Sequence, residues 1–329
     1  MKNILGSVAT LLLGAVILSS ATGCKTACSE TDKGSECTAK SLTRFDGTAA
    51  SKSTDYGAGN SLNVDGVYGN VSVKSGAQTG KVEVTFQPFD YQGYDEESIA
   101  QDEMNQDLDL TVSGGETVNV SATRHDSSNG LGANIQILLP AEFAGAITIN
   151  NHGNGAIAGN AHEFDTFVDF VGTSSSVNVK GGADLGDCVV KGSPSVTSST
   201  VDCGHLVNVT NVSDNITLTS REGEKFDDPT IVFALAGISA GSGGGTVTAS
   251  TDGPIDGTFP AAATFSVQAY APNNGVVNEG TLPAGCTKEE VAAGSKTITC
   301  GTGGPNYTLT ANGETDSVFA NGNIYLHWQ

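Results

Sequence analysis

Seven cysteines are the residues of this chain with the clearest potential for chemistry. Six of them form three pairs that are close in sequence, and the seventh lies near the N-terminus. An even number of cysteines at short spacings is typical of disulfide bonds in an exported chain. We predict pairing within each local pair, with other connectivities open. Zinc is the alternative, but the C-x-x-C spacing of many zinc sites is missing. The predicted bridges are Cys28–Cys37, Cys188–Cys203 and Cys286–Cys300.

The seventh cysteine, Cys24, has the sequence context of a lipid attachment site. It follows the small residues Ala21–Gly23, which come after a positive Lys2 and an apolar stretch, Ile4–Leu18. This order resembles a bacterial export signal that is cut before the cysteine, whose thiol is then lipidated. The apolar stretch is too short to span a bilayer comfortably. Lys25 stands where the enterobacterial sorting pattern places Asp to hold a lipoprotein at the inner membrane, so we expect the outer membrane.

Two short motifs could carry catalysis or a metal, and neither has the right context. Gly237–Gly241 fits G-x-S-x-G, but the glycine-rich residues that follow cannot start the helix which a nucleophile elbow needs. His162–Asp165 gathers possible ligands, but Phe164 makes one side of such a strand apolar. We therefore predict no catalytic residue, no metal and no cofactor. A pair of carboxylates acting on a polysaccharide remains the alternative.

Composition indicates an exported β protein. The formal net charge is −21, so the chain repels nucleic acid and anionic lipid. Glycine accounts for 43 of 329 residues and charged residues for only 16%, which argues against a helical bundle. Short, regular groups of valine, isoleucine, leucine and phenylalanine argue against disorder.

From Leu62 onward, apolar residues alternate with polar ones. Such alternation predicts short strands with one buried and one solvated face. The first pairs are Leu62 and Val64, Val71 and Val73, and Val82 and Val84.

Residues 90–109 interrupt this pattern with eight acids and no base. We predict a solvated surface loop with a short helix near Glu96–Gln106, because only this segment of the mature chain has helix-forming composition. Calcium is the alternative, but the EF-hand order of ligands is absent. If the insert contacts a partner, the candidate residues are Asp95, Glu96, Glu97, Asp102 and Glu103.

The middle of the chain repeats weakly. Pairs of β-branched residues begin at Ile147, Val177 and Val207, a spacing of 30. A short strand roughly every ten residues predicts an elongated β-solenoid, in which strands stack on earlier coils. A β-sandwich is the alternative. A Cys188–Cys203 bridge would tie neighbouring coils and contribute about 3 kcal/mol, and Trp328 would cap the C-terminal end of the core.

Four segments resemble the DUF4097-type, adhesin-like β-solenoid proteins of bacterial envelopes. Leu62–Val73 (LNVDGVYGNVSV) is similar to the opening V-x-G-V-x-G-x-V-x-V repeat of that family, and Ile135–Pro140 (IQILLP) to its apolar strand ending in proline. Ile147–Gly155 is similar to the I-x-I-x-x-x-x-G coil, and Asn321–Leu326 (NGNIYL) to the N-G-D-I-x-L ending, with Asn323 where Asp is common. The resemblance implies a right-handed β-solenoid and an envelope location, and it brings no catalytic residue.

Together these patterns predict an all-β chain in three parts. Residues 1–23 are a lipoprotein signal peptide, 24–57 a lipidated cysteine with a flexible polar tether, and 58–329 a β-solenoid body. We expect a non-enzymatic envelope protein for adhesion, scaffolding or partner binding. Its partners would be the membrane, through the lipid, and a protein or glycan surface.

Overall fold

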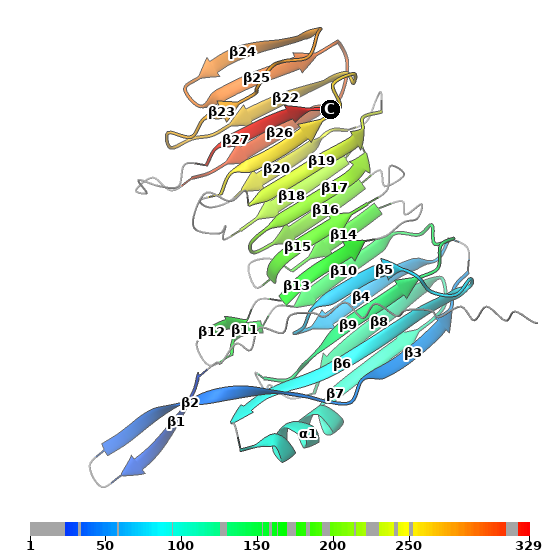
Figure 1. Ribbon diagram of the computed structural model, residues 1–329, viewed down its shortest axis with the longest axis vertical. Coiled ribbons are helices and arrows are strands. Elements are labelled where there is room, and N and C mark those ends of the chain that lie inside the picture. Colours follow the sequence, from blue (N-terminus) through cyan, green and yellow to red (C-terminus); the bar gives the residue numbers. More distant parts are fainter. Residues whose placement is uncertain are drawn as a thin grey trace, which may run out of the picture.

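The computed structural model shows an elongated, almost entirely β protein (Figure 1). It describes residues 24–31, 34–57, 59–93, 95–125, 130–152, 154–157, 160–162, 164–169, 176–181, 185–192, 198–213, 215–221, 230–239, 243–249, 253–313 and 322–329. Of these, only the backbone is described for 24–41, 67, 152–162 and 185. No helix in these ranges has the length and apolar character that crossing a membrane requires.

Two large sheets contain nearly all the strands. The first sheet comprises β1 (Cys24–Thr31), β2 (Gly34–Asp46), β3 (Ala50–Asp55), β5 (Val71–Ser75), β6 (Lys81–Gly93), β9 (Gly132–Leu139), β13 (Phe164–Asp169), β15 (Leu185–Lys191), β17 (Val207–Ser213), β19 (Ile231–Gly237), β21 (Ile255–Phe259), β23 (Val277–Asn278) and β27 (Ile324–Trp328). The second comprises β4 (Ser61–Val67), β7 (Leu108–Ser113), β8 (Thr117–Arg124), β10 (Ile147–His152), β14 (Ser176–Lys180), β16 (Ser198–Cys203), β18 (Asn215–Ser220), β20 (Gly245–Ala249), β22 (Phe265–Tyr270), β24 (Cys286–Ala292), β25 (Ser295–Cys300) and β26 (Asn306–Ala311). A small hairpin pairs β11 (Asn154–Ile157) with β12 (Asn160–His162).

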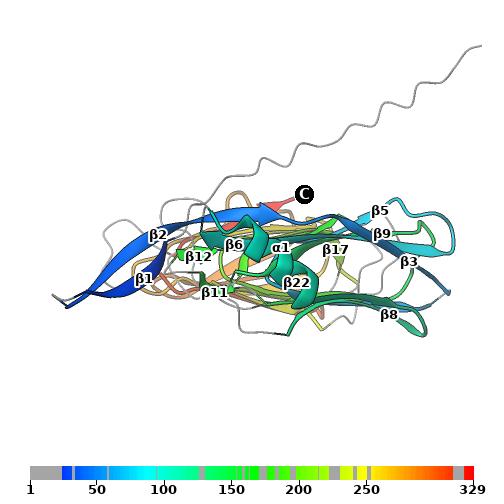
Figure 2. The same cartoon turned by 90° about the horizontal axis from the view of Figure 1, so that it is seen from below.

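The strands are stacked as a parallel solenoid. From β13 to β21 the chain alternates between the two sheets, and each strand pairs in parallel with the next strand of its own sheet. Figure 2, seen along the stack, shows a flattened cross-section with the two sheets as facing layers. The predicted all-β fold is confirmed. The facing layers give a sandwich-like section, while the parallel pairing follows the solenoid pattern.

The alternating residues form the core, as predicted. Leu62, Val64, Val71, Val73 and Val82 are each at most 1% exposed, and polar residues between them face outward. Because both sheets turn their β-branched residues inward, one continuous apolar core runs along the stack.

The sequence spacing of 30 predicts the pairing of stacked strands correctly for Ile147 and Val177, but not for Val177 and Val207. Ile147 pairs with Val177 in the second sheet, one rung apart. Val177 then pairs with Ser199 of β16, whereas Val207 lies in the first sheet beside Cys188. Coil length therefore varies along the stack.

A ladder of side chains supports the first sheet. Four residues lie near the starts of successive strands of this sheet: Asn134, Asn70, Asp165 and Asp187. The Oδ1 atom of each accepts a hydrogen bond from a backbone N–H of the next rung. The donors, in the same order, are Asn70, Asp165, Asp187 and Leu206. The N···O distances are 2.9, 2.9, 3.0 and 3.3 Å. We call these four residues the Asx ladder. It satisfies backbone donors where the chain enters each strand.

Two of the predicted disulfides are present among the described side chains. Cys188 in β15 and Cys203 in β16 are bonded and fully buried, and Cys286 is bonded to Cys300. The first bridge joins consecutive strands across the core between the facing sheets, and not strands stacked in one sheet. The tie between stacked coils that we expected is therefore replaced by a tie between layers.

Antiparallel strands cover the N-terminal end of the stack. β6 pairs with β9, and β2 and β3 pair with β6. These two strands lie within 24–57, where composition alone predicts a flexible tether. Edge strands need only backbone partners, so small polar residues can form them: β3 is largely exposed.

The acidic insert is helical where predicted. The helix α1 runs from Glu97 to Gln106, with Ala100 and Met104 buried one turn apart. The insert is not one solvated loop, because β6 extends to Gly93, β7 begins at Leu108, and Asp90 is fully buried.

An aromatic cluster fills the C-terminal end of the core. Phe259 lies 5.0 Å from Phe265 and 5.3 Å from Tyr307, measured between ring centroids. Trp328 stacks on Phe265 at 6.2 Å, which confirms its predicted place at this end. Gly257 leaves the space for the ring of Phe233, since a Cβ there would lie 2.5 Å from its Cζ.

The Asx ladder gives a stability prediction. Asp187→Ala removes the acceptor for the Leu206 N–H, which should lower the free energy of unfolding by about 1–2 kcal/mol. Asp187→Asn keeps an oxygen at that position and serves as the matched control. Urea titration followed by circular dichroism measures both, and equal destabilisation by the two variants would contradict the ladder's role.

Candidate functional site

The C-terminal tip is the candidate functional site. We define the tip as β22, β25 and β24, which end the second sheet, with β23, β27 and the turns joining them. In Figure 1 it lies at the opposite end of the body from the β1–β2 hairpin. β24 and β25 form an antiparallel hairpin in which Cys286 is opposite Cys300, and their disulfide closes its open end.

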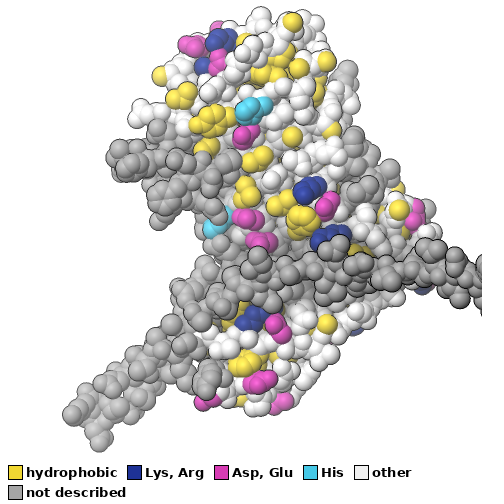
Figure 3. Space-filling view, viewed as in Figure 1, with side chains coloured by type: hydrophobic (Ala, Val, Ile, Leu, Met, Phe, Trp, Pro, Cys, Tyr) yellow, Lys and Arg dark blue, Asp and Glu magenta, His cyan; other side chains and the backbone are white. Residues whose placement is uncertain are grey.

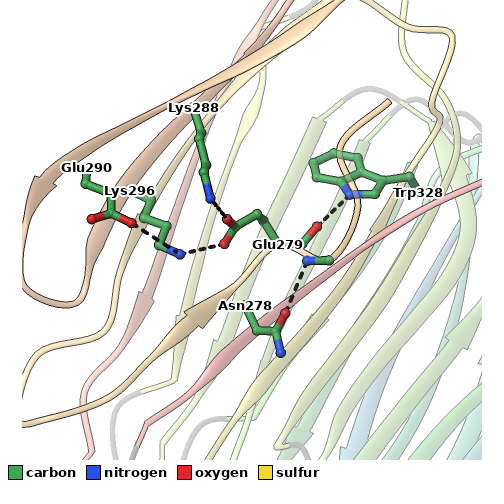
Figure 4. A network of polar contacts seen from close by, with 7 residues as sticks. Asn278, Glu279, Lys288, Glu290, Lys296 and Trp328 are labelled. Carbon is green, nitrogen blue, oxygen red and sulfur yellow. Dashed lines mark hydrogen bonds and ion pairs between the residues drawn. The ribbon is translucent and has the colours of Figure 1, made fainter. Parts of the chain in front are cut away.

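A buried carboxylate fastens this hairpin to the first sheet (Figure 4). Glu279, which follows β23, is 7% exposed and accepts hydrogen bonds from two ammonium groups. Lys288 of β24 donates to its Oε1, and Lys296 of β25 donates to its Oε2 at 2.6 Å. The backbone oxygen of Glu279 accepts the indole N–H of Trp328 at 2.8 Å. Glu279 therefore links both strands of the hairpin to β27 of the first sheet.

The charge of Glu279 is stabilised by its surroundings. Burial alone raises the pKa of this carboxyl, but the hydrogen bonds from Lys288 and Lys296 outweigh burial and lower the pKa to about 2. The ionised network is thus maintained over the whole physiological range. This pairing is structural, because both carboxylate oxygens are already engaged.

The surface of the tip is unusually apolar. Five large hydrophobic side chains are exposed among the described residues, and four of them belong to the tip. Figure 3 shows hydrophobic and charged side chains close together at this end. Exposed large apolar side chains can mark an interaction surface, and here they are concentrated at one end of the body. The four are Tyr270, Val276, Val291 and Tyr325, with 49, 59, 63 and 37% of their surface exposed.

A groove of 390 Å³ runs beside the edge strand at the tip. It lies between the turn that leads into β23 and the far end of the β24–β25 hairpin. Val276, Val277 and Ala292 line it on the apolar side, and Glu290 and Lys296 on the polar side. Such a groove can take one apolar side chain and orient it by charge.

The predicted contact residues of the acidic insert divide into two groups. Asp95, Glu97 and Asp102 are exposed. Glu96 turns back to accept the backbone N–H of Gly93 at 2.9 Å, and Glu103 accepts the side-chain amide of Gln92 at 3.1 Å. Three of the five are therefore presented to solvent.

Beneath this helix lies a carboxyl that sequence reasoning placed at the surface. Asp90 is fully buried, and the same Gln92 amide donates to its Oδ2 at 2.9 Å. Burial, together with the nearby carboxylate of Glu103, raises the pKa of Asp90 to about 6. Burial likewise raises the pKa of Asp165 in the Asx ladder. Each of these carboxyls has a structural partner.

The remaining sequence-predicted sites are only partly described. β1 begins at Cys24, and the register places Cys28 opposite Cys37 in the β1–β2 hairpin, but the side chains of all three lie outside the described set. Glu163 and residues 240 and 241 of the G-x-S-x-G segment also lie outside it. Among described residues, no three histidine, cysteine or acidic side chains gather as a metal site would require.

Comparison with known proteins gives little. No protein-family profile matches the chain, and no curated protein matches it. One similar solved structure is described as a "putative cell adhesion protein" from Clostridium sporogenes, with 9% identity and a TM-score of 0.32 over 86% of this chain and 100% of that one. Another is a "putative adhesin" from Bacteroides fragilis, with 11% identity and a TM-score of 0.36 over 85% and 97%. Similarity at this level carries no argument about chemistry or partners.

No sequence pattern pointed to the ion network or to the exposed valines of the tip. Glu279, Lys288 and Lys296 are separated by turns of unremarkable composition, and only the hairpin fold brings them together. The exposed valines look like core residues in sequence, because alternation predicts a face but not whether another layer covers it.

Glu279 gives a prediction of pH dependence. Its pKa is lower in the folded protein than its ordinary value of 4.5, so its contribution is present above pH 4.5 and is lost as the pH falls towards 2. Glu279→Gln should remove about 1–2 kcal/mol at pH 7, because charged hydrogen bonds are strong but half-exposed Lys288 is screened. The variant should also lack the loss of stability that protonation of Glu279 causes between pH 4.5 and pH 2.

Hydrogen exchange of the β24–β25 amides between pH 7 and pH 3 measures this effect. Glu289→Gln, at an exposed position of β24, is the matched control and should behave as the wild type. If Glu279→Gln and wild type lose protection in parallel as the pH falls, the network does not hold the hairpin.

Proposed function

We propose that this chain is a lipid-anchored, exported protein of the bacterial envelope which binds a partner through its tip and catalyses no reaction. The observation that carries the proposal is the position of the exposed apolar side chains. Four of the five described ones lie at the end of the body opposite the hairpin that starts with Cys24. An anchored protein with a contact surface at its far end is suited to adhesion, scaffolding or partner binding.

The anchor rests on residues at the N-terminus. Residues 1–23 form the signal peptide of this proposal, Cys24 carries the lipid, the following polar residues connect it to the body, and the outer membrane holds the lipid. More than one acyl chain gives stable attachment. The β1–β2 hairpin projects from the lower end of the body in Figure 1, on the same side of the stack as α1.

The solenoid acts as a spacer in this proposal. Its core is one continuous set of buried apolar side chains, and its outward residues along the middle strands are mostly small and polar. A stack of rungs joined by backbone hydrogen bonds keeps its two ends at a set separation. The acidic helix α1, with Ile99 47% exposed, is a second candidate contact surface near the anchored end.

Lipidation predicts a simple labelling result. Cells expressing the chain with radiolabelled palmitate should incorporate label, and Cys24→Ser should abolish incorporation and release the protein from the membrane fraction. Cys28→Ser, four residues away, is the control and should retain the label. Label that persists in Cys24→Ser would contradict the anchor.

Site-specific photo-cross-linking tests where the partner binds. Benzoylphenylalanine placed at Val276 or Val291 should give covalent adducts with envelope components in living cells. The same probe at Asn178 or Thr217, on the outward faces of the middle strands, should give none. A probe at Ile99 tests the acidic helix. Adducts from the middle strands equal to those from the tip would contradict the proposal.

A further inference from the structure

The edge strand β24 is open to pairing. It is the last strand of the second sheet, and among the described residues it pairs only with β25. Six of its seven residues are exposed. On the side away from β25, every second residue of such a strand directs its backbone N–H and C=O outward. The first sheet ends differently, in β23, which has only two residues.

The charges on this edge favour a basic partner. Lys288 is neutralised by Glu279, and Glu290 lies 3.9 Å from Lys296, with 69% of its side chain exposed. Glu289 has no ion-pair partner among the described residues. Like charges directly opposite each other destabilise a strand pair, so this edge disfavours a strand that places acidic residues opposite Glu289 and Glu290.

Apolar surface continues from the end of the edge. The strand has an irregular register between Glu290 and Ala292, at Val291, which is 63% exposed. The groove with Val276 lies beside it. Charges on an edge also prevent aggregation, and a protected edge is usually short and polar. β24 is long and leaves a valine exposed next to a groove, which is a combination that fits binding.

We propose that β24 binds an extended, basic polypeptide segment of a partner by strand addition. The segment pairs its backbone with the free edge, places lysine or arginine opposite Glu289 on one face of the sheet, and puts the next, apolar side chain on the other face, against the groove beside Glu290. This inference rests on the proposed function, in which the tip is the contact surface.

Fluorescence anisotropy with defined peptides tests the inference. The probe is a fluorescein-labelled (Lys-Val)₄ amide, compared with (Glu-Val)₄ and with (Lys-Val)₄ that is N-methylated at every residue, so that neither edge of the peptide can donate a backbone hydrogen bond. The protein is the chain from Cys24 onward, with oxidised disulfides. Only unmodified (Lys-Val)₄ should bind, because N-methyl groups block strand pairing while leaving the charge unchanged.

Matched charge variants locate the site. Glu289→Lys with Glu290→Lys should weaken binding at least tenfold. Glu97→Lys with Glu116→Lys, which makes the same change in net charge at exposed positions of the other end, should bind as the wild type does. Circular dichroism confirms that both variants fold.

Three outcomes would overturn the inference. The first is that the N-methylated peptide binds as tightly as unmodified (Lys-Val)₄. The second is that the Glu97/Glu116 variant loses as much affinity for (Lys-Val)₄ as the Glu289/Glu290 variant. The third is that the wild type sediments as a dimer and the Glu289/Glu290 variant as a monomer, which would assign the edge to a second copy. If (Lys-Val)₄ does not bind while cross-linking from Val291 persists, strand addition is wrong and the tip remains the contact surface. If both fail, the proposed function fails as well.

Discussion

The structure depends on the in-register stacking of short parallel strands. Each rung places its inward residues directly over those of the next, so that the apolar core and the backbone ladder extend together. The Asx ladder supports the points where the chain enters the first sheet, and the Cys188–Cys203 bridge ties the two layers across the core. Turns can vary in length because none of these interactions passes through them.

A stack of this kind has two ends. Antiparallel strands cover both, and each end contains a buried carboxyl. The two carboxyls behave in opposite ways. Asp90 is poorly compensated and its pKa is raised to about 6, so it favours the folded state most at acidic pH and loses that contribution as the pH rises through 6. Glu279 is fully paired and favours the folded state above pH 4.5. At neutral pH, therefore, the ionisation of Glu279 stabilises the fold at the tip, whereas the burial of Asp90 opposes folding at the other end.

Local patterns predicted local structure well. Alternation identified the buried residues of the early strands, composition identified α1 to within one residue, and short spacing identified the disulfides Cys188–Cys203 and Cys286–Cys300. Longer-range features failed for a physical reason. The period of 30 assumed equal turns, the tether assumed that small polar residues stay solvated, and Asp90 was placed at the surface because its sequence neighbours are acidic. Pairing with β6 decides the course of β2 and β3, and the packing of α1 against β6 decides the burial of Asp90; no local pattern encodes either.

Long-range pairing also explains why the tip was not predicted. Its ion network and its exposed valines depend on which strands lie at the end of each sheet, and no local pattern encodes that order. If the coils stack as described, the solenoid separates the two ends of the body and the tip lies at the end of the stack.

Oxidative cross-linking tests the stacking most directly. Asn178 and Thr200 face outward from registered positions in β14 and β16, whereas Asn208 lies in the other sheet. Cysteines introduced at Asn178 and Thr200 should cross-link rapidly, and cysteines at Asn178 and Asn208 should not. Cross-linking of the second pair with none in the first would mean that the strands repeat every 30 residues, and would contradict the structure described here.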